Sequence, residues 1–452
     1  MLENATGLTW VDPQRVMFSE IKSGWHFAIV TSTESRSEER DVYVPPRETD
    51  MAHNSYLSPD GNWVLATEMR TTSFVPCRLV PFKGGEARPV GPQNGGCTSA
   101  AWSPDGKWMY FTSDSGGHGS HIWRQGFPDG TPQQITRGPT EEAGIAMAPD
   151  GHSFITSVGT EQSNVWIHDE HGDRQISSEG YATNSVLSPD GTKLFYLLAP
   201  SSSEHWHEAG GELWVHDFTS GQGSRVLPGI AVIDFNLSPD GKRVVFETRD
   251  ERGKRRLWLA SLDHRFAPKL ISANSGESNP IYAASGRIYF RASEGDAEFL
   301  YRMNEDGSRR EKVVPEPVLL LFAVSPDERF VEALRPIKEE EATTGVEAIP
   351  LEGGPAIRIC SHFCGASWSR DGKVLYLSLP GMKATFSTYV IPLAPGVDLP
   401  PLPAKGVFSE NDLPKHSSLS GVDDFIHPGP NSSLYSFSRV NAHWNLYRVP
   451  IQ

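Results

Sequence analysis

The chain has 452 residues, of which 38% are hydrophobic and 10% aromatic, so it can build one large core or two medium ones. Lys and Arg number 41 against 56 Asp and Glu, and the resulting net charge of -15 would repel a nucleic-acid backbone. We therefore expect no nucleic-acid partner. The longest apolar run, 318–324, is far shorter than the ~20 residues of a membrane helix. The sequence thus predicts no membrane segment, and the N-terminus has no signal-peptide pattern.

One short pattern returns along the chain: an apolar residue, a Ser-Pro-Asp-Gly turn and an aromatic-rich strand. Its fullest copy is 101–111, Ala-Trp-Ser-Pro-Asp-Gly-Lys-Trp-Met-Tyr-Phe. Pro presets φ, Asp bonds the backbone two residues on and Gly accepts a positive φ, so the four residues predict a tight turn between two strands. Full copies of the turn begin at Ser58, Ser103, Ser188 and Ser238, and copies that lack one letter begin at Ala148, Ser325 and Ser369.

The spacing of these turns, about 40 to 50 residues, is typical of four-stranded propeller blades. A strand with an aromatic residue follows each turn by about twenty residues, for example at Trp123, Trp166, Trp214 and Trp258. We therefore predict an all-β chain, a β-propeller of about ten repeat units within 1–452. The units start near 8, 53, 98, 143, 182, 231, 278, 319, 364 and 422, with a Pro-rich insertion at 393–421.

Ring closure is the open question, because propellers usually have four to eight blades. No long connection divides the repeats apart from the late insertion, so we expect one large ring, with two smaller propellers as the alternative. The last unit supplies only three strands, and residues before Thr9 are the available donor of a fourth.

The amino-acid sequence of these repeats resembles that of a known family. The repeated Trp-Ser-Pro-Asp-Gly-Lys turn, followed by an apolar-aromatic strand and a Leu-Trp strand, looks like the TolB-type, WD-like propeller repeat. The stretch Thr98 to Phe111, with His-Ile-Trp-Arg-Gln at 121–125, resembles the C-terminal propeller regions of bacterial transmembrane serine/threonine protein kinases. That resemblance implies a sensor or interaction module that lies outside the cytoplasm as part of a membrane-anchored protein.

Catalytic motifs are missing from the repeats. The chain has no Gly-rich phosphate loop, no His-Arg-Asp or Asp-Phe-Gly motif and no Gly-x-Ser-x-Gly elbow. We therefore expect a non-enzymatic module without a cofactor, which binds a small molecule, a peptide or a protein at the mouth of the channel. The alternatives are a metal-dependent propeller lyase or hydrolase that uses His-rich loops, and a propeller that gates a peptidase.

Candidate binding residues lie on the face opposite the Ser-Pro-Asp-Gly turns. Two His-rich loops offer ligands for a metal, because neutral imidazoles can converge on an ion with a third donor; they contribute Asp114, His118, His121, His205, Trp206 and His207. A basic hairpin tip with Arg249 and Arg252 suits a carboxylate or an acidic partner, although a solvated tip explains it as well. Residues that lead into first strands are expected to line the channel, namely Glu142, Asn184, Asp234 and Asn279.

Four cysteines are too few for a disulfide framework at this length. Cys360 and Cys364 form the one close pair, which suits a small loop disulfide, half of a metal site or two separate thiols. Cys77 and Cys97 fall in consecutive units and are a second possible pair.

Overall fold

The computed structural model describes residues 5–23, 26–47, 50–70, 73–116, 119–199, 210–263, 265–274, 276–339, 342–381 and 386–451. These residues form strands β1 to β38 and one short 3-10 helix, η1 (Glu410–Asp412). No described helix is long and apolar enough to cross a membrane. The prediction of an all-β fold of the propeller type is confirmed, because most of the strands gather in antiparallel sheets of four.

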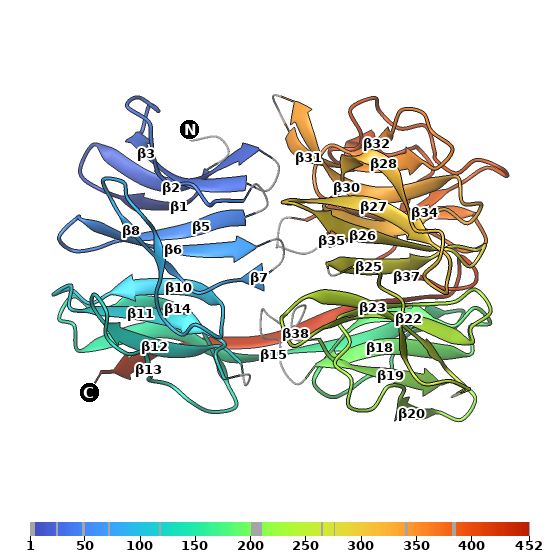
Figure 1. Ribbon diagram of the computed structural model, residues 1–452, viewed down its shortest axis with the longest axis horizontal. Coiled ribbons are helices and arrows are strands. Elements are labelled where there is room, and N and C mark those ends of the chain that lie inside the picture. Colours follow the sequence, from blue (N-terminus) through green and yellow to red (C-terminus); the bar gives the residue numbers. More distant parts are fainter. Residues whose placement is uncertain are drawn as a thin grey trace. The chain divides into compact units, whose positions relative to one another are not determined.

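The chain divides into two compact units. The described parts of Met1–Gln162 and Asn441–Gln452 belong to unit 1, and those of Ser163–Pro200 and Ala209–Val440 belong to unit 2. Within each unit the strands of one sheet lie side by side (Figure 1).

Unit 1 begins with two antiparallel groups, which a single parallel bridge between Phe27 and Met51 joins. The first group is β1 (Ala5–Trp10), β2 (Arg15–Ser23), β3 (His26–Thr33) and β4 (Arg40–Tyr43). The second group is β5 (Asp50–Leu57), β6 (Trp63–Arg70), β7 (Ser73–Phe74), β8 (Arg78–Pro81) and β9 (Arg88–Pro89). A third sheet is β10 (Cys97–Trp102), β11 (Trp108–Ser113), β12 (His121–Gly126) and β13 (Gln133–Gln134).

Unit 2 contains five sheets that follow one another along the chain. The first two are β17 (Tyr181–Leu187), β18 (Lys193–Ala199), β19 (Glu212–Asp217) and β20 (Gln222–Arg225), then β21 (Asp234–Leu237), β22 (Arg243–Arg249), β23 (Arg255–Ser261) and β24 (Lys269–Leu270). The third and fourth are β25 (Glu277–Tyr282), β26 (Ile288–Glu294), β27 (Ala297–Met303) and β28 (Glu311–Pro317), then β29 (Leu320–Val324), β30 (Phe330–Glu339), β31 (Ala342–Pro350) and β32 (Ile357–Cys360). The fifth is β33 (Gly365–Trp368), β34 (Val374–Pro380), β35 (Phe386–Pro392) and β36 (Ser418–Leu419).

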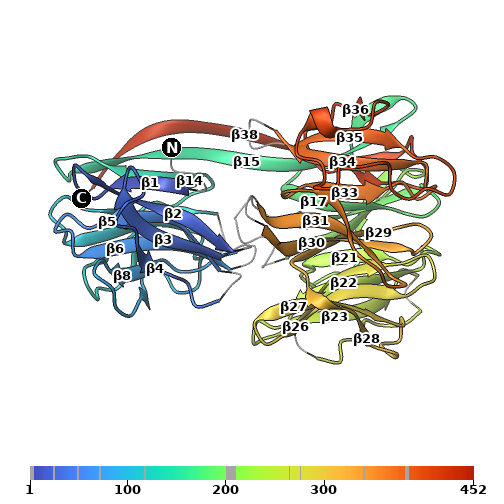
Figure 2. The same ribbon diagram turned by 90° about the horizontal axis from the view of Figure 1, so that it is seen from above.

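Two long strands contribute residues to both units. β15 (Ser153–Asp169) pairs with β14 (Glu141–Met147) through its first half and with β16 (Gly172–Gln175) through its last residues. β38 (Tyr435–Pro450) lies beside β15 and also pairs with β37 (His427–Pro428) (Figure 2). Within unit 2 these segments complete a further sheet in the order β37, β38, β15, β16.

This pairing corrects the expected source of the closing strand. The described residues before Thr9 lie in β1 and pair with β2, for example Thr6 with Ser19. The strands that complete the C-terminal sheet come instead from β15 and β16. Trp166 accordingly belongs to a unit 2 sheet, whereas Phe154, in the same strand, packs within unit 1.

The first strands of the unit 2 sheets contact one another in a closed series. β17 contacts β21, and the contacts continue through β25, β29, β33 and β37 back to β17. Apolar side chains of consecutive sheets pack between them; Phe195 and Phe246, for example, share one core cluster. One ring or two smaller propellers for 1–452 stays a prediction.

The Ser-Pro-Asp-Gly turns have the predicted tight geometry, and the Ser side chain adds two hydrogen bonds to it. In the turn at 103–106 the backbone N–H of Gly106 donates to the carbonyl of Ser103 at 2.9 Å, and Gly106 has φ of 69°. The buried Ser103 hydroxyl donates to Asp105 at 2.6 Å and accepts the backbone N–H of Trp108 at 2.9 Å. Ser188, Ser238, Ser325 and Ser369 make the same pair of bonds in their turns.

Candidate functional site

Six residues near the beginnings of the first strands of unit 2 form the candidate site. Each first strand, or the two residues before it, contributes one of them, and we call the set the six-residue ring: Asn184, Asp234, Asn279, Phe322, Phe363 and Phe425. Because the six strands contact one another in a closed series, these residues follow one another around it. All six side chains are partly exposed.

Three consecutive polar members are joined by hydrogen bonds. The Asn184 amide donates to Asp234 Oδ1 at 3.5 Å, and the Asn279 amide donates to Asp234 Oδ2 at 3.1 Å. The other end of the Asn279 amide accepts the backbone N–H of Leu321 at 2.8 Å. The three channel-lining residues predicted in unit 2 therefore lie together.

A backbone irregularity places the two asparagines. β17 shifts register between Thr183 and Val186, and β25 shifts register between Ser278 and Ile281, as expected for β-bulges. Within these bulges Asn184 has φ of 49° and Asn279 has φ of 54°. Asn tolerates the left-handed region better than most residues, so the same residue type suits both the bulge and the hydrogen bonds.

Among the polar members only Asp234 can ionise, and its surroundings shift its pKa. The pKa of Asp234 is raised to about 7; burial is the largest cause and the neighbouring Glu247 carboxylate adds to it, while the Asn279 bond opposes the shift. Glu247 is itself fully buried; its Oε1 accepts from Arg255 at 2.7 Å and its Oε2 accepts the backbone N–H of Asn279 at 2.8 Å. A cationic ligand beside Asp234 would favour its ionised form, because an opposite charge lowers the pKa of a carboxyl group.

The other three members form an aromatic arc. The ring centroids of Phe322 and Phe363 lie 6.1 Å apart, and those of Phe363 and Phe425 lie 6.4 Å apart, both edge-on. Phe386, the first residue of β35, joins them at 4.4 Å from Phe425. A Cβ on Gly365 would overlap the Phe425 ring, so this glycine leaves the space that the ring fills.

A disulfide closes the loop that carries Phe363 of the aromatic arc. Cys360 and Cys364 are bonded, and the loop that they close contains Phe363. Next to Phe425, burial raises the pKa of Asp424 to about 6, and burial lowers the pKa of His427 to about 4. The arc is thus bordered by groups that are mostly uncharged at mildly acidic pH.

Unit 1 holds the described part of the first His-rich loop, and there the predicted residues have structural partners. His121 and Glu142 are buried, and His121 Nδ1 lies 2.9 Å from Glu142 Oε2. The Thr136 hydroxyl also donates to Glu142 Oε2, at 2.7 Å. Asp114 Oδ1 accepts the backbone N–H of Gly96 at 2.8 Å.

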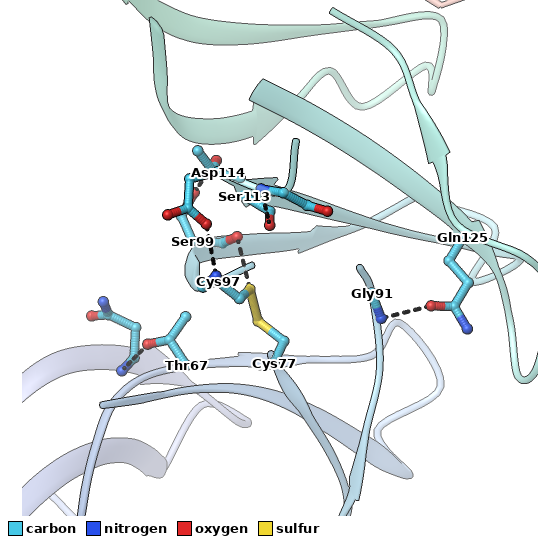
Figure 3. The surroundings of a disulfide bond; sticks show 12 residues. Thr67, Cys77, Gly91, Cys97, Ser99, Ser113, Asp114 and Gln125 are labelled. Atoms are coloured by element: carbon cyan, nitrogen blue, oxygen red, sulfur yellow. Dashed lines mark hydrogen bonds between the residues drawn. A yellow bond between two sulfur atoms is a disulfide. The ribbon is translucent and has the colours of Figure 1, made fainter. Parts of the chain in front are cut away.

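Both cysteine pairs that the sequence suggested are disulfides. Cys77 is bonded to Cys97, and Figure 3 shows Asp114 and Ser99 close to this bond. The Ser99 and Thr112 hydroxyls lie 2.6 Å apart in the neighbouring strand pair. The disulfide therefore joins the start of β10 to the residue just before β8.

The predicted metal ligands are largely untested. His118, His205, Trp206 and His207 lie outside the described residues. Among the residues that the structure describes, no group of three His, Cys, Asp or Glu side chains is arranged to hold a metal ion. The His-rich metal site stays a prediction.

The basic segment forms the hairpin tip between β22 and β23. Asp250 Oδ1 accepts the backbone N–H groups of Arg252 and Lys254, and its Oδ2 accepts from Arg256 at 3.3 Å. Arg249 donates to the carbonyl of Gly253 at 3.4 Å. Arg252 is exposed on the turn, so a role in binding stays a prediction for it.

Sequence reasoning missed the aromatic arc. Phe363 and Phe425 each stand two residues before a first strand, and Phe322 is the third residue of one. The polar channel residues were predicted from this same position, so position gave a usable signal.

Comparison with solved structures finds distant propellers. A putative TolB from Agrobacterium tumefaciens has 18% identity, with 61% of this chain and 83% of that chain covered and a TM-score of 0.27. TolB from Acinetobacter baumannii has 13% identity, 67% and 64% coverage and a TM-score of 0.25. An oligogalacturonate lyase from Vibrio parahaemolyticus has 13% identity, 75% and 81% coverage and a TM-score of 0.36. No family model matches the chain.

Proposed function

We propose that the chain is a non-catalytic binding module and that the six-residue ring of unit 2 holds its ligand. We further propose that the six sheets of unit 2 form one propeller, with the ring at the mouth of its channel. The closed series of first-strand contacts supports this arrangement. In it, the residues of the ring point to one ligand from six directions.

The observation that carries the proposal is the division of the ring into two halves. Asn184, Asp234 and Asn279 follow one another on one side, and three phenylalanines follow on the other. Binding sites for small molecules and peptides combine apolar walls with a few oriented polar groups in this way. The ligand that complements both halves is an amphipathic one, such as a peptide with an apolar and a basic side chain.

Two disulfides support a location outside the cytoplasm, because structural disulfides persist in oxidising compartments. A ligand site on a propeller there fits the sensor region that the sequence resembles. We propose this signalling role, and a membrane anchor for the protein, from the amino-acid sequence of the repeats alone.

The test is a binding screen with N-acetylated tetrapeptide amides in which one position is Phe or Leu and the next is Lys, Gln or Glu. We expect the peptides with Lys to raise the melting temperature of the chain most, because a ligand that binds only the folded state stabilises it by mass action. Calorimetric titration then gives the affinity.

Two variants locate the site. Phe363→Ala removes one wall of the aromatic arc, and Asp234→Asn removes the carboxylate; each should weaken binding about tenfold. Phe266→Ala is the matched control, because Phe266 is an exposed phenylalanine of unit 2 that is not part of the ring. Equal affinity in all three variants would rule out the ring as the binding site.

A further inference from the structure

A cleft in unit 1 lies between two Ser-Pro-Asp-Gly turns, away from the face where the sequence predicted the candidate binding residues. The turns begin at Ser58 and Ser103, and the cleft has a volume of about 320 Å³. Its walls include three aromatic rings and two carboxylates, and we call it the tryptophan cleft: Asp60, Trp63, Trp102, Asp105 and Phe127.

The aromatic walls are held in place by packing and by hydrogen bonds. Phe127 meets Trp102 at 5.4 Å and Trp63 at 5.9 Å between ring centroids, both edge-on. The Trp102 indole N–H donates to the carbonyl of Tyr56 at 3.0 Å, which fixes the orientation of that ring. Trp63 and Phe127 remain partly exposed, so their rings are accessible to a ligand.

The two carboxylates keep a negative charge at the rim. Hydrogen bonds from Ser58 and Asn62 lower the pKa of Asp60, and a bond from Ser103 lowers the pKa of Asp105. Lys107, which is 77% exposed, lies 3.3 Å from Asp105 Oδ2. A pair this exposed is weak, so it leaves Asp105 available to another cation.

Arg88, which contacts the residue after Phe127, is already paired. Arg88 donates to the carbonyl of Pro128, beside Phe127, and forms an ion pair of 2.9 Å with Asp129. The described residues that line the cleft include neither Lys nor Arg.

Unit 2 contains an equivalent cleft of about 390 Å³ that provides an internal comparison. It lies between the turns that begin at Ser188 and Ser238. Lys193 takes the place of Trp63, because each donates its backbone N–H to the Ser hydroxyl of its turn at 2.9 Å. Leu262 takes the place of Phe127, because each donates its backbone N–H at 2.8 Å to the residue after the Gly of the next turn.

The comparison shows what distinguishes the tryptophan cleft. The unit 2 cleft has the same two turn aspartates, Asp190 and Asp240, but Lys193 and Arg225 also line it and supply positive charge. The tryptophan cleft has aromatic rings where unit 2 has Lys193 and Leu262. An aromatic face attracts a cation and cannot supply one.

We propose that the tryptophan cleft binds a compact organic cation, a quaternary or protonated amine, between its aromatic rings and its two turn carboxylates. The rings supply cation–π attraction and apolar contact to the alkyl groups, and Asp60 and Asp105 supply the counter-charge. The site is separate from the six-residue ring, and this proposal does not depend on the function proposed for that ring.

The test compares choline with 3,3-dimethylbutan-1-ol, which has the same shape without the charge. Both are titrated into the full chain at constant ionic strength, with calorimetry and tryptophan fluorescence as readouts. We expect saturable binding of choline and at least about tenfold weaker binding of the neutral alcohol, the difference that loss of the cation–π and charge contacts gives.

The double variant Trp63→Lys with Phe127→Leu converts the cleft to the residues that unit 2 carries at the equivalent places. Because the fold already accepts these residues in unit 2, a melting curve should show a folded chain. Choline binding should fall about tenfold or more in this variant and also in Asp60→Asn. Phe363→Ala, in the six-residue ring, should leave the affinity for choline unchanged.

Three results would overturn the proposal. One is equal affinity for choline and the neutral alcohol, which would show an apolar cleft without cation selectivity. Another is unchanged choline binding in the folded double variant and in Asp60→Asn. The third is the absence of saturable choline binding up to about 0.1 M.

Discussion

The side-chain amide of Asn279 donates a hydrogen bond of 3.1 Å to Asp234 Oδ2, from the first strand of one sheet to the first strand of the sheet before it. The same side chain accepts the backbone N–H of Leu321 on the following sheet. One residue therefore joins three consecutive sheets. The φ of 54° at Asn279 makes its backbone conformation part of this connection.

Substitutions at Asn279 should separate the contribution of its side-chain hydrogen bonds from that of its left-handed backbone conformation. Asn279→Gly keeps the left-handed backbone and removes the side-chain bonds, so we expect a loss of about 1–2 kcal/mol in the free energy of unfolding. Asn279→Ala should cost about 1 kcal/mol more, because a Cβ disfavours a positive φ. Chemical denaturation measures both values. Equal stability of the Gly and Ala variants would contradict the role given to the backbone.

Glu332 in β30 should make unit 2 less stable as the pH rises. Its carboxyl is fully buried, neither oxygen has a hydrogen-bond partner among the described residues, and burial raises its pKa well above the usual value. Between the unfolded pKa of about 4.3 and the higher folded value, the folded chain keeps a proton that the unfolded chain has released. Stability is therefore lost as the pH rises through this window.

The variant Glu332→Gln removes the titrating group and keeps the shape. We expect its melting temperature to exceed that of the parent by about 2–4 °C or more at pH 8, with a smaller difference at pH 5. Calorimetry at the two pH values measures this. Glu352→Gln, at an exposed position, is the control and should change neither value. A pH-independent difference for Glu332→Gln would contradict the assigned titration.

The two disulfides should differ in their effect on stability. Cys77–Cys97 spans 20 residues and Cys360–Cys364 spans four, and the entropy that a cross-link removes from the unfolded chain grows with the loop it closes. Replacing the first pair by Ala should cost about 3 kcal/mol and replacing the second about 2 kcal/mol. Denaturation curves of the two double variants test this order, and a larger loss for the short loop would contradict it.

The short disulfide should matter more for binding than for stability. It closes the loop that carries Phe363, so its removal lets this ring leave the aromatic arc. Under the proposed function, Cys360→Ala with Cys364→Ala should weaken binding of the Phe-Lys tetrapeptide, whereas Cys77→Ala with Cys97→Ala should not. Calorimetric titration of the folded variants distinguishes the two. Equal affinities would show that the loop needs no cross-link to position Phe363.

The repeated turns could be predicted from sequence because their chemistry is local. Pro, Asp and Gly act within four residues, and Ser103 completes the turn through bonds to its neighbours. The polar half of the ring was predictable for a similar reason, since Asp234 and Asn279 occupy matching places in their repeats. The hydrogen bond between them depends on strand contacts between distant residues, which no local pattern records.

The exchange of strands between the units was not predicted from the sequence. Other repeats have a turn between their second and third strands, as at Asp250 to Lys254. β15 and β38 run straight through the equivalent place over 17 and 16 residues. A repeat period cannot reveal this, because the aromatic strand at Trp166 keeps its spacing while its sheet partners change.

Gly159 should be essential to the pairing of these two strands in unit 1. A Cβ there would overlap the carbonyl oxygen of His443 and lie 2.7 Å from the Trp444 ring, so β38 can approach β15 only where the side chain is absent. Because strand backbone cannot move aside without losing ladder bonds, we expect Gly159→Ala to cost about 1–3 kcal/mol.

Gly223→Ala is the matched control, because a Cβ at this strand position meets no atom closer than 3.8 Å. It should leave the free energy of unfolding within about 0.5 kcal/mol of the parent. Hydrogen exchange then locates the effect: Gly159→Ala should speed exchange of the backbone amides of residues 441–450 and leave those of β21 to β24 protected. Uniformly faster exchange across both units would instead show that the substitution unfolds the chain as a whole, and slow exchange in 441–450 would show that β38 tolerates the added methyl group.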